Sequence, residues 1–132
     1  MAVNWLAVIA AAISMFVIGG IWYGPLFGKP WQKAAGLSDE QLKAGNMPMI
    51  FGIAFVLALL MAANLAFLVT ATPPLPLSMI VMYAIAAGLG FSTFGLGMVA
   101  AFERRSLSYV LINGAYLTLS FAVMGLILGL WR

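Results

Sequence analysis

The sequence predicts an all-α protein, a four-helix transmembrane bundle with short amphipathic helices in its first connecting loop. The composition indicates this, because 65% of the 132 residues are hydrophobic and only 7% are charged. Soluble domains average roughly 45–50% apolar and about 25% charged residues. A water-soluble fold of this length could not bury so much apolar surface, so a lipid bilayer is the expected solvent.

Long uncharged stretches set the expected spans. A helix needs about 20 apolar residues to cross a hydrocarbon core of about 30 Å. The stretch over residues 46–102 is too long for one span, and the clustered Pro73, Pro74 and Pro76 divide it, because such a run cannot continue a helix. We therefore expect a single transmembrane domain over residues 1–132, with helices over residues 3–23, 49–71, 77–102 and 107–130.

The first connection, residues 24–48, is long and is predicted to lie along the membrane surface. Pro25 should end the first span, and Pro30 should start a short helix over residues 31–35 that stops at Gly36. The run Ser38-Asp39-Glu40-Gln41 is typical of a capping box at the start of a second short helix, which Gly45 closes.

Basic residues are divided unequally between the two sides of the membrane. The loops over residues 24–48 and 103–106 fall on one side and carry all lysines and arginines except Arg132. The positive-inside rule puts that side in the cytoplasm, so both termini should lie outside a bacterial cytoplasmic (inner) membrane. Anionic headgroups should attract the basic side chains on the inner side: Lys29, Lys33, Lys43, Arg104 and Arg105.

Aromatic residues near the ends of the spans are expected to anchor the helices at the two membrane interfaces. They are Trp5, Trp22, Tyr23, Trp31 and Trp131.

Small residues recur at helical spacing along three of the expected spans. The stripes are Gly20-x-x-x-Gly24, Ala84-x-x-x-Gly88-x-x-x-Ser92 and Gly125-x-x-x-Gly129. Such stripes let helix backbones approach closely, and we expect them to pack within the bundle rather than between copies. Four short helices enclose little interior, so some self-association is also expected.

Neutral polar residues inside the spans are the candidate site residues. They are Asn64, Tyr83, Ser92, Thr93, Asn113 and Tyr116. A rise of about 1.5 Å per residue puts the two asparagines at different depths, Asn64 level with Tyr83, so they should not bond each other. Each asparagine is expected to make its own interhelical hydrogen bond. A polar cavity is the alternative.

The chain is not expected to be an enzyme or to hold a metal or cofactor. Cysteine and histidine are absent, and the acidic residues Asp39, Glu40 and Glu103 lie outside the expected spans. Neither a nucleophile with its base nor a proton-coupling carboxylate is available. The scattered basic residues do not form a nucleic-acid footprint.

Two functions remain from different classes. The first is a non-catalytic scaffold, accessory or lipid-interacting protein, with membrane lipids, further copies of the chain or an unidentified membrane protein as partners. The alternative is an oligomeric channel or passive facilitator for a small solute or ion, lined by neutral Asn, Ser, Thr and Tyr side chains.

Several motifs point to a known family. They are Asn4-Trp5, the run Gly20-Ile21-Trp22-Tyr23-Gly24-Pro25-Leu26-Phe27-Gly28-Lys29 followed by Trp31, the run Asn113-Gly114-Ala115-Tyr116, and the run Gly129-Leu130-Trp131. On these residues the chain resembles the DUF1761 family of uncharacterised bacterial membrane proteins over nearly its whole length. Gly24 is a departure, since family members often have Ser there. The resemblance implies a small four-helix membrane protein and supplies no catalytic residues.

Overall fold

The computed structural model describes residues 2–132, and the regular elements in that range are helices. Four helical spans are long and apolar enough to cross a membrane: Trp5–Leu26, Met47–Thr70, Leu77–Phe102 and Leu107–Leu130. The predicted all-α class is confirmed, and the chain is a multi-pass membrane protein. The last two spans cover the residues expected from the sequence.

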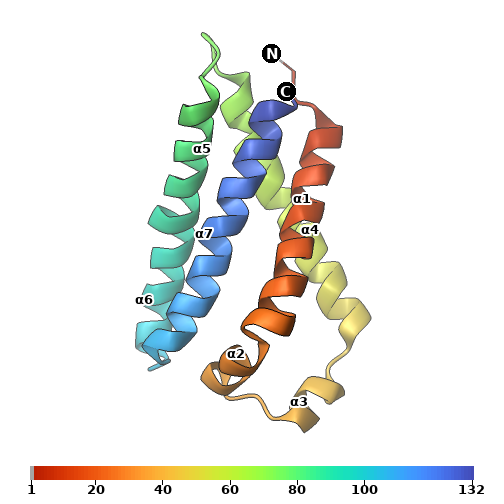
Figure 1. Cartoon of the computed structure of the whole chain (residues 1–132), viewed down its shortest axis with the longest axis vertical. Helices are drawn as coiled ribbons and strands as arrows, with labels where there is room; N and C mark the ends of the chain where they lie inside the picture. The colour runs from red at the N-terminus through yellow and green to blue at the C-terminus, as the bar shows by residue number, and fades with distance from the viewer. Residues whose placement is uncertain (1) are drawn as a thin grey trace.

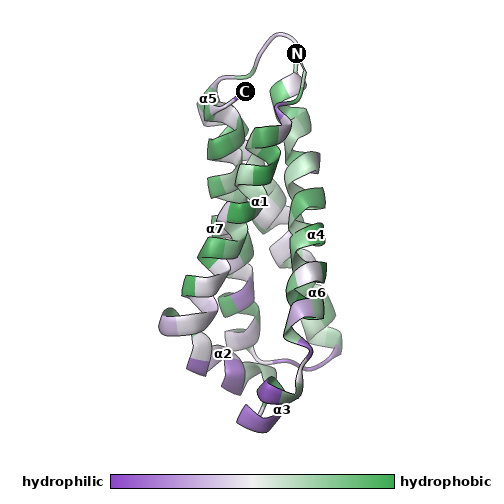
Figure 2. Ribbon diagram, turned by 90° about the vertical axis from the view of Figure 1, so that its right-hand side faces the viewer, coloured by the Kyte–Doolittle hydropathy of each residue, from purple (hydrophilic) through white to green (hydrophobic). Residues whose placement is uncertain are grey.

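The ends of the spans differ in chemistry. In Figure 1 both chain termini lie beside the turn between α4 (Met47–Leu65) and α5 (Leu77–Ile85), and α2 (Gly28–Ala35) and α3 (Asp39–Ala44) lie at the opposite end. Figure 2 shows the hydrophilic residues gathered at that opposite end. We call the end with α2 and α3 the basic end, and the end with the termini the terminal end. At the terminal end, Asn4 Nδ2 donates to the carbonyl of Trp131 over 3.0 Å.

The central helix is α7 (Leu107–Leu130). It packs against α1 (Trp5–Ile21) on one face, and on another against α5 and the π-helical segment η3 (Ala86–Thr93). By contrast, α4 packs mainly on α1 and touches α7 little. Small and aliphatic side chains dominate the buried core, among them Ala7, Ala11, Ala12, Ala58, Ala62, Ala66, Ile80, Ala84, Met124 and Leu128.

The first span continues past the residue expected to stop it. Asn4 caps α1 with its side-chain oxygen, so the helix begins at Trp5 rather than at residue 3. Beyond α1 the chain widens into a π-helical turn, η1 (Trp22–Leu26), which contains Pro25. The prediction that Pro25 ends the span is wrong, because a wider turn accommodates the ring that would clash in an α-helix.

The loop after the first span holds two short helices, as the sequence suggested. α2 begins at Gly28, earlier than expected, because Pro30 fits inside its first turn where no backbone N–H is needed. Gly36 ends α2 in the left-handed region, at φ 70°. The capping box between Ser38 and Gln41 starts α3. Gly45 follows α3 in an extended conformation rather than the left-handed one typical of a glycine stop.

The second span is attached to the bundle by only part of its length. α4 begins at Met47, before the expected residue 49, because Asn46 caps it. The span ends in a tighter 3₁₀ segment, η2 (Ala66–Thr70). Near the basic end its side chains are exposed, with Phe51 at 57%. The buried side chains of the span begin at Ala58, and nearer the basic end Phe51 and Phe55 contact α1 through the Phe16 ring.

Two of the three small-residue stripes meet each other inside the chain. A Cβ atom on Gly125 would lie 2.5 Å from the Cβ of Ala84, and one on Gly88 would lie 2.8 Å from the Cβ of Phe121. Glycine thus sets the close approach of α7 to α5 and η3. The first stripe behaves differently, because a Cβ on Gly20 or Gly24 would meet nothing within 4 Å. The expectation that this stripe packs within the bundle is wrong.

Candidate functional site

The neutral polar side chains of the spans fall into three places, and the first lies between α1, η1 and α7. Tyr23 in η1 donates its hydroxyl hydrogen to Asn113 Oδ1 over 2.5 Å. Asn113 Nδ2 in turn donates to the carbonyl of Tyr109, one turn earlier on α7, over 2.9 Å. Asn113 therefore links two spans while its amide nitrogen remains bonded within its own helix.

Two further bonds join the same helices. Tyr116 donates its hydroxyl to the carbonyl of Met15 over 2.9 Å, and Trp22 Nε1 donates to the carbonyl of Ile112 over 2.9 Å. Gly19 makes room for the Tyr116 ring, since a Cβ there would lie 3.1 Å from the Tyr116 hydroxyl oxygen. We call Trp22, Tyr23, Asn113 and Tyr116 the polar seam.

The polar seam continues into α2 through aromatic contacts. The Tyr23 ring meets Tyr116 edge-on at a centroid distance of 5.1 Å, and it meets Trp31 of α2 at 5.3 Å. Offset and edge-to-face aromatic pairs are favourable at such distances. The seam therefore fixes α2 beneath the end of α1, and Trp31 acts as a packing residue as well as an expected interface anchor.

The second place surrounds Thr93 at the end of η3. Its hydroxyl oxygen lies 2.9 Å from the carbonyls of Gly88 and Gly114 and 3.1 Å from the hydroxyl oxygen of Thr118. With one hydrogen, Thr93 donates to one carbonyl and can accept from Thr118. Of these residues, Thr93, Gly114 and Thr118 line a groove of about 610 Å³ between η3 and α7, which we call the η3–α7 groove. Its hydroxyls are already satisfied within the chain.

The third place is a groove between α4 and α5, with Phe121 of α7 also in its lining. This α4–α5 groove has a volume of about 310 Å³, and its polar residues are Asn64 and Tyr83. Asn64 Nδ2 donates to the carbonyl of Leu60 in its own helix over 2.8 Å. The expected interhelical bond of Asn64 is therefore wrong, because α4 leans on α1 and leaves the Asn64 side chain exposed rather than facing a partner helix.

Tyr83 is 41% exposed, and its hydroxyl makes no hydrogen bond within residues 2–132. Asn64 and Tyr83 line the same groove, in keeping with their similar expected depth. Ser92, the remaining candidate, is half-buried and lines neither groove.

The basic end contains the charged residues proposed for headgroup contact. Lys29, Lys33, Lys43 and Arg104 are exposed there. Arg105 differs, because its guanidinium donates to the carbonyl of Ala35 at the end of α2 over 3.1 Å.

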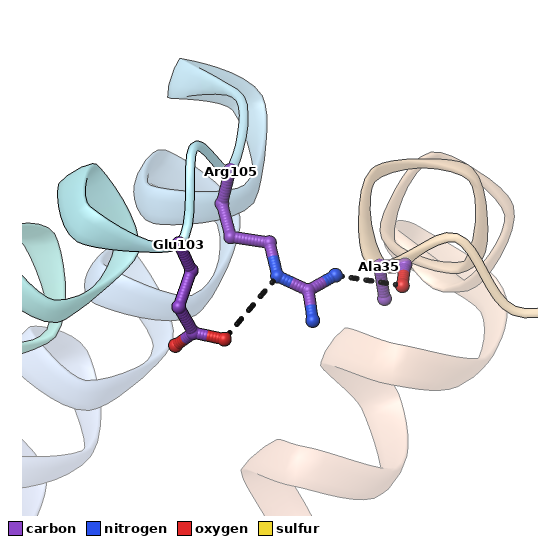
Figure 3. Close-up of polar contacts among 3 residues, drawn as sticks. All are labelled: Ala35, Glu103 and Arg105. Carbon is purple, nitrogen blue, oxygen red and sulfur yellow. Dashed lines mark hydrogen bonds and ion pairs between the residues drawn. The ribbon is translucent and has the colours of Figure 1, made fainter.

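Figure 3 shows Arg105 reaching from the loop between α6 (Phe94–Phe102) and α7 toward Ala35, with Glu103 beside it. The Arg105 Nε lies 3.8 Å from a Glu103 carboxylate oxygen. A cation at the C-terminal end of a helix also interacts favourably with the helix dipole. Arg105 thus has a structural partner in α2 in addition to its expected contact with lipid headgroups.

The family model described as a protein of unknown function, DUF1761, matches residues 6–129, nearly the whole chain. The chain belongs to the DUF1761 family. No curated protein and no solved structure matches it.

In this DUF1761 protein, the polar seam is built from residues of the motifs on which the resemblance to the family rests. The early motif supplies Trp22 and Tyr23, and the late motif supplies Asn113 and Tyr116. Sequence reasoning assigned the first two to interface anchoring and did not foresee that they bond to α7. The sequence did hold a signal for these bonds, because the Trp22 N–H and the Tyr23 O–H are expected at a depth in the membrane close to that of Asn113.

The chemistry open to the DUF1761 site is hydrogen bonding by uncharged groups. The polar seam and the Thr93 cluster use their groups to join helices. The α4–α5 groove alone of these three places keeps free hydrogen-bonding capacity facing outward from the described chain.

Proposed function

We propose that this DUF1761 protein is a non-catalytic protein of the bacterial cytoplasmic membrane that works by binding lipids or another membrane protein. The observation that carries this is the use of intramembrane polar groups as links between helices. Tyr23, Asn113 and Tyr116 join the first span to α7 through hydrogen bonds. Polar groups that are hydrogen-bonded between helices hold the bundle together and are not free to bind or react with a substrate. They therefore favour a scaffold over a transport or catalytic site.

The proposed orientation places the basic end in the cytoplasm and both termini outside. The support is the charge distribution, since the loops at the basic end carry all the basic residues except Arg132. In that orientation Lys29 and Lys33 on α2 and Lys43 on α3 face the anionic inner leaflet. A periplasm-specific reporter fused after Arg132 should be active, and a cytoplasm-specific reporter there should be silent. The reverse pattern would refute the orientation.

The proposed lipid binding is tested by measuring which lipids the protein enriches around itself. Protein reconstituted in mixed vesicles of phosphatidylglycerol and phosphatidylethanolamine should enrich the anionic lipid around it at low salt. Replacing Lys29, Lys33 and Lys43 together by Gln should abolish most of that enrichment, since each basic residue near the surface contributes about 1 kcal/mol.

The matched control replaces the same three lysines by Arg, which keeps the positive charge and leaves the capping box of α3 intact, and it should keep the enrichment. An unselective wild-type protein, or a Gln variant that remains selective, would contradict lipid binding at the basic end. Raising the salt concentration should weaken the effect in the wild type, because the contacts are electrostatic.

A second candidate function, an oligomeric channel or passive facilitator, is favoured by the α4–α5 groove. Asn64 and Tyr83 present free neutral polar groups there, and several copies could place them around a pore. Efflux of small solutes and ions from sealed vesicles that contain the protein tests this. Flux that Asn64→Leu reduces would support the channel, and vesicles as tight as protein-free ones would exclude it.

A further inference from the structure

In the α4–α5 groove, two candidate residues of the spans come together with polar groups left free within residues 2–132; Ser92 also makes no side-chain hydrogen bond there, but it lines neither groove. Asn64 keeps its Oδ1 and one N–H free, and Tyr83 keeps its hydroxyl free within the described chain. The Asn64 amide cannot be turned around, because its oxygen would then face the Leu60 carbonyl oxygen at 2.8 Å. In hydrocarbon there is no water to satisfy such groups, and each one left unpaired costs free energy. A partner outside the chain that bonds to Asn64 and Tyr83 would remove this cost.

The depth of Asn64 and Tyr83 in the membrane limits which kinds of partner can reach them. Asn64 lies in the span that ends at Thr70, and Tyr83 lies in the span that begins at Leu77. Both are about 9–12 Å from the terminal end of their helices, at a rise of 1.5–2.0 Å per residue. Spans of 24 and 26 residues exceed the hydrocarbon thickness by several Å. The pair thus lies a few Å below the hydrocarbon boundary, within reach of the carbonyl oxygens of an amphiphile in that leaflet.

The residues that line the groove indicate the chemistry of the other parts of such a ligand. Met61, Leu65, Leu68, Ala87 and Phe121 surround the pair, and no charged residue is among them. A charged head would have no counter-charge there, whereas an apolar tail would contact aliphatic and aromatic walls. The free donors, the Tyr83 hydroxyl and the second Asn64 N–H, suit carbonyl acceptors. Concave apolar sites with a few polar groups are typical of small-molecule binding.

We propose that the α4–α5 groove binds an uncharged membrane amphiphile, whose carbonyl oxygen accepts hydrogen bonds from Tyr83 and Asn64 and whose apolar tail lies along Met61, Leu68 and Phe121. Two kinds of membrane compound share this chemistry, namely the ester carbonyls of a diacyl lipid and the ring carbonyls of an isoprenoid quinone. The volume of about 310 Å³ fits the carbonyl-bearing part rather than a whole lipid. This site is separate from the headgroup contacts at the basic end, so either can fail without the other.

The η3–α7 groove is a less suitable site for such an amphiphile than the α4–α5 groove. The η3–α7 groove is larger, about 610 Å³, but its Thr93 and Thr118 hydroxyls already bond to each other, and Thr93 also bonds to the backbone. A ligand there would gain little from hydrogen bonding. Thr118→Val therefore gives a matched control variant, in which one polar atom is removed from a groove of the same helix bundle.

The test uses the full chain in neutral detergent with two probes, decylubiquinone and dioleoylglycerol, and native mass spectrometry of the complexes. The wild type should retain at least one probe. Tyr83→Phe and Asn64→Leu should each weaken binding several-fold, and the double variant should weaken it at least tenfold. Thr118→Val should stay within twofold of the wild type. Binding of decylubiquinone alone identifies the quinone source, and binding of dioleoylglycerol identifies the ester source.

The variants should fold, because neither Asn64 nor Tyr83 bonds to another helix, and helical circular dichroism on heating checks this. Tyr83→Phe, which removes one oxygen only, keeps the test valid if Asn64→Leu is unstable. The proposal is overturned if neither probe binds or if every variant binds equally. It is also overturned if the double variant loses a dimer seen in the wild type without any probe effect, since the groove would then be an interface between copies.

Discussion

The two faces of α7 hold their neighbours by different means. Toward α1, α7 uses hydrogen bonds from long side chains, as in the pairs of Tyr23 with Asn113 and Tyr116 with Met15. Toward α5 and η3, the helices approach closely at Gly125 of α7 and Gly88 of η3, and the Thr93 hydroxyl adds bonds to α7 only at the end of η3. Close packing has almost no slack, whereas a long side chain can shift to preserve a bond. Substitutions of similar size should therefore lower the free energy of unfolding by very different amounts on the two faces.

The largest effect is expected on the glycine face. Gly125→Leu should lower the free energy of unfolding by about 3 kcal/mol or more, because the added carbons must displace the α5 backbone behind Ala84. Gly20→Leu is the control, since a Cβ there meets nothing within 4 Å, and it should not lower stability. Reversible unfolding in mixed micelles measures both. Equal stability of the two variants would show that the glycine contact does not limit packing.

An intermediate effect is expected on the polar face. Tyr23→Phe and Asn113→Leu should each cost about 0.5–2 kcal/mol, and the double variant should cost less than their sum, because the two side chains share one hydrogen bond. Tyr109→Phe is the control, because the Tyr109 hydroxyl makes no bond within residues 2–132. Strictly additive costs in the double-mutant cycle would mean that the Tyr23–Asn113 bond contributes nothing.

The smallest effect compares one substitution on both faces. Gly19→Ala should cost less than about 1 kcal/mol, because its new Cβ meets the tip of the Tyr116 side chain, which can move. Gly125→Ala should cost more, since its Cβ meets a Cβ fixed to the backbone of α5. Adding Tyr116→Phe should remove most of the Gly19→Ala cost. If Gly19→Ala lowers the free energy of unfolding as much as Gly125→Ala does, the two faces of α7 do not differ in their tolerance of an added methyl group.

The fold was predictable because its signals are strong and local. Uncharged length predicts the spans, and Ser38 with Gln41 predicts the start of α3. The π-helical turn at Pro25 was not predictable, since whether a proline ends a helix depends on whether the surrounding helix can widen.

The candidate site was predicted less well than the fold. Composition identifies Asn64 and Asn113 as the amides inside the spans, but not which way each one faces. Asn113 faces η1 and bonds to it, whereas the lean of α4 onto α1 leaves Asn64 in an open groove. Helix tilt is set by packing, which a single sequence does not reveal.

The central position of α7 has a consequence for synthesis. Tyr116 and Met15 are separated by 101 positions, and Trp22 and Ile112 by 90. At a translation rate of about 5–20 residues per second, α1 waits roughly 5–20 s before the ribosome has made the helix that pairs with it.

During that wait the N–H of Trp22 and the hydroxyl of Tyr23 need temporary partners. Both lie close to the basic end of the first span, where water and lipid headgroups can serve them. A seam at mid-membrane would leave the same groups unpaired in hydrocarbon until translation had passed α7. The location of the seam thus lets the first helix be inserted early and joined late.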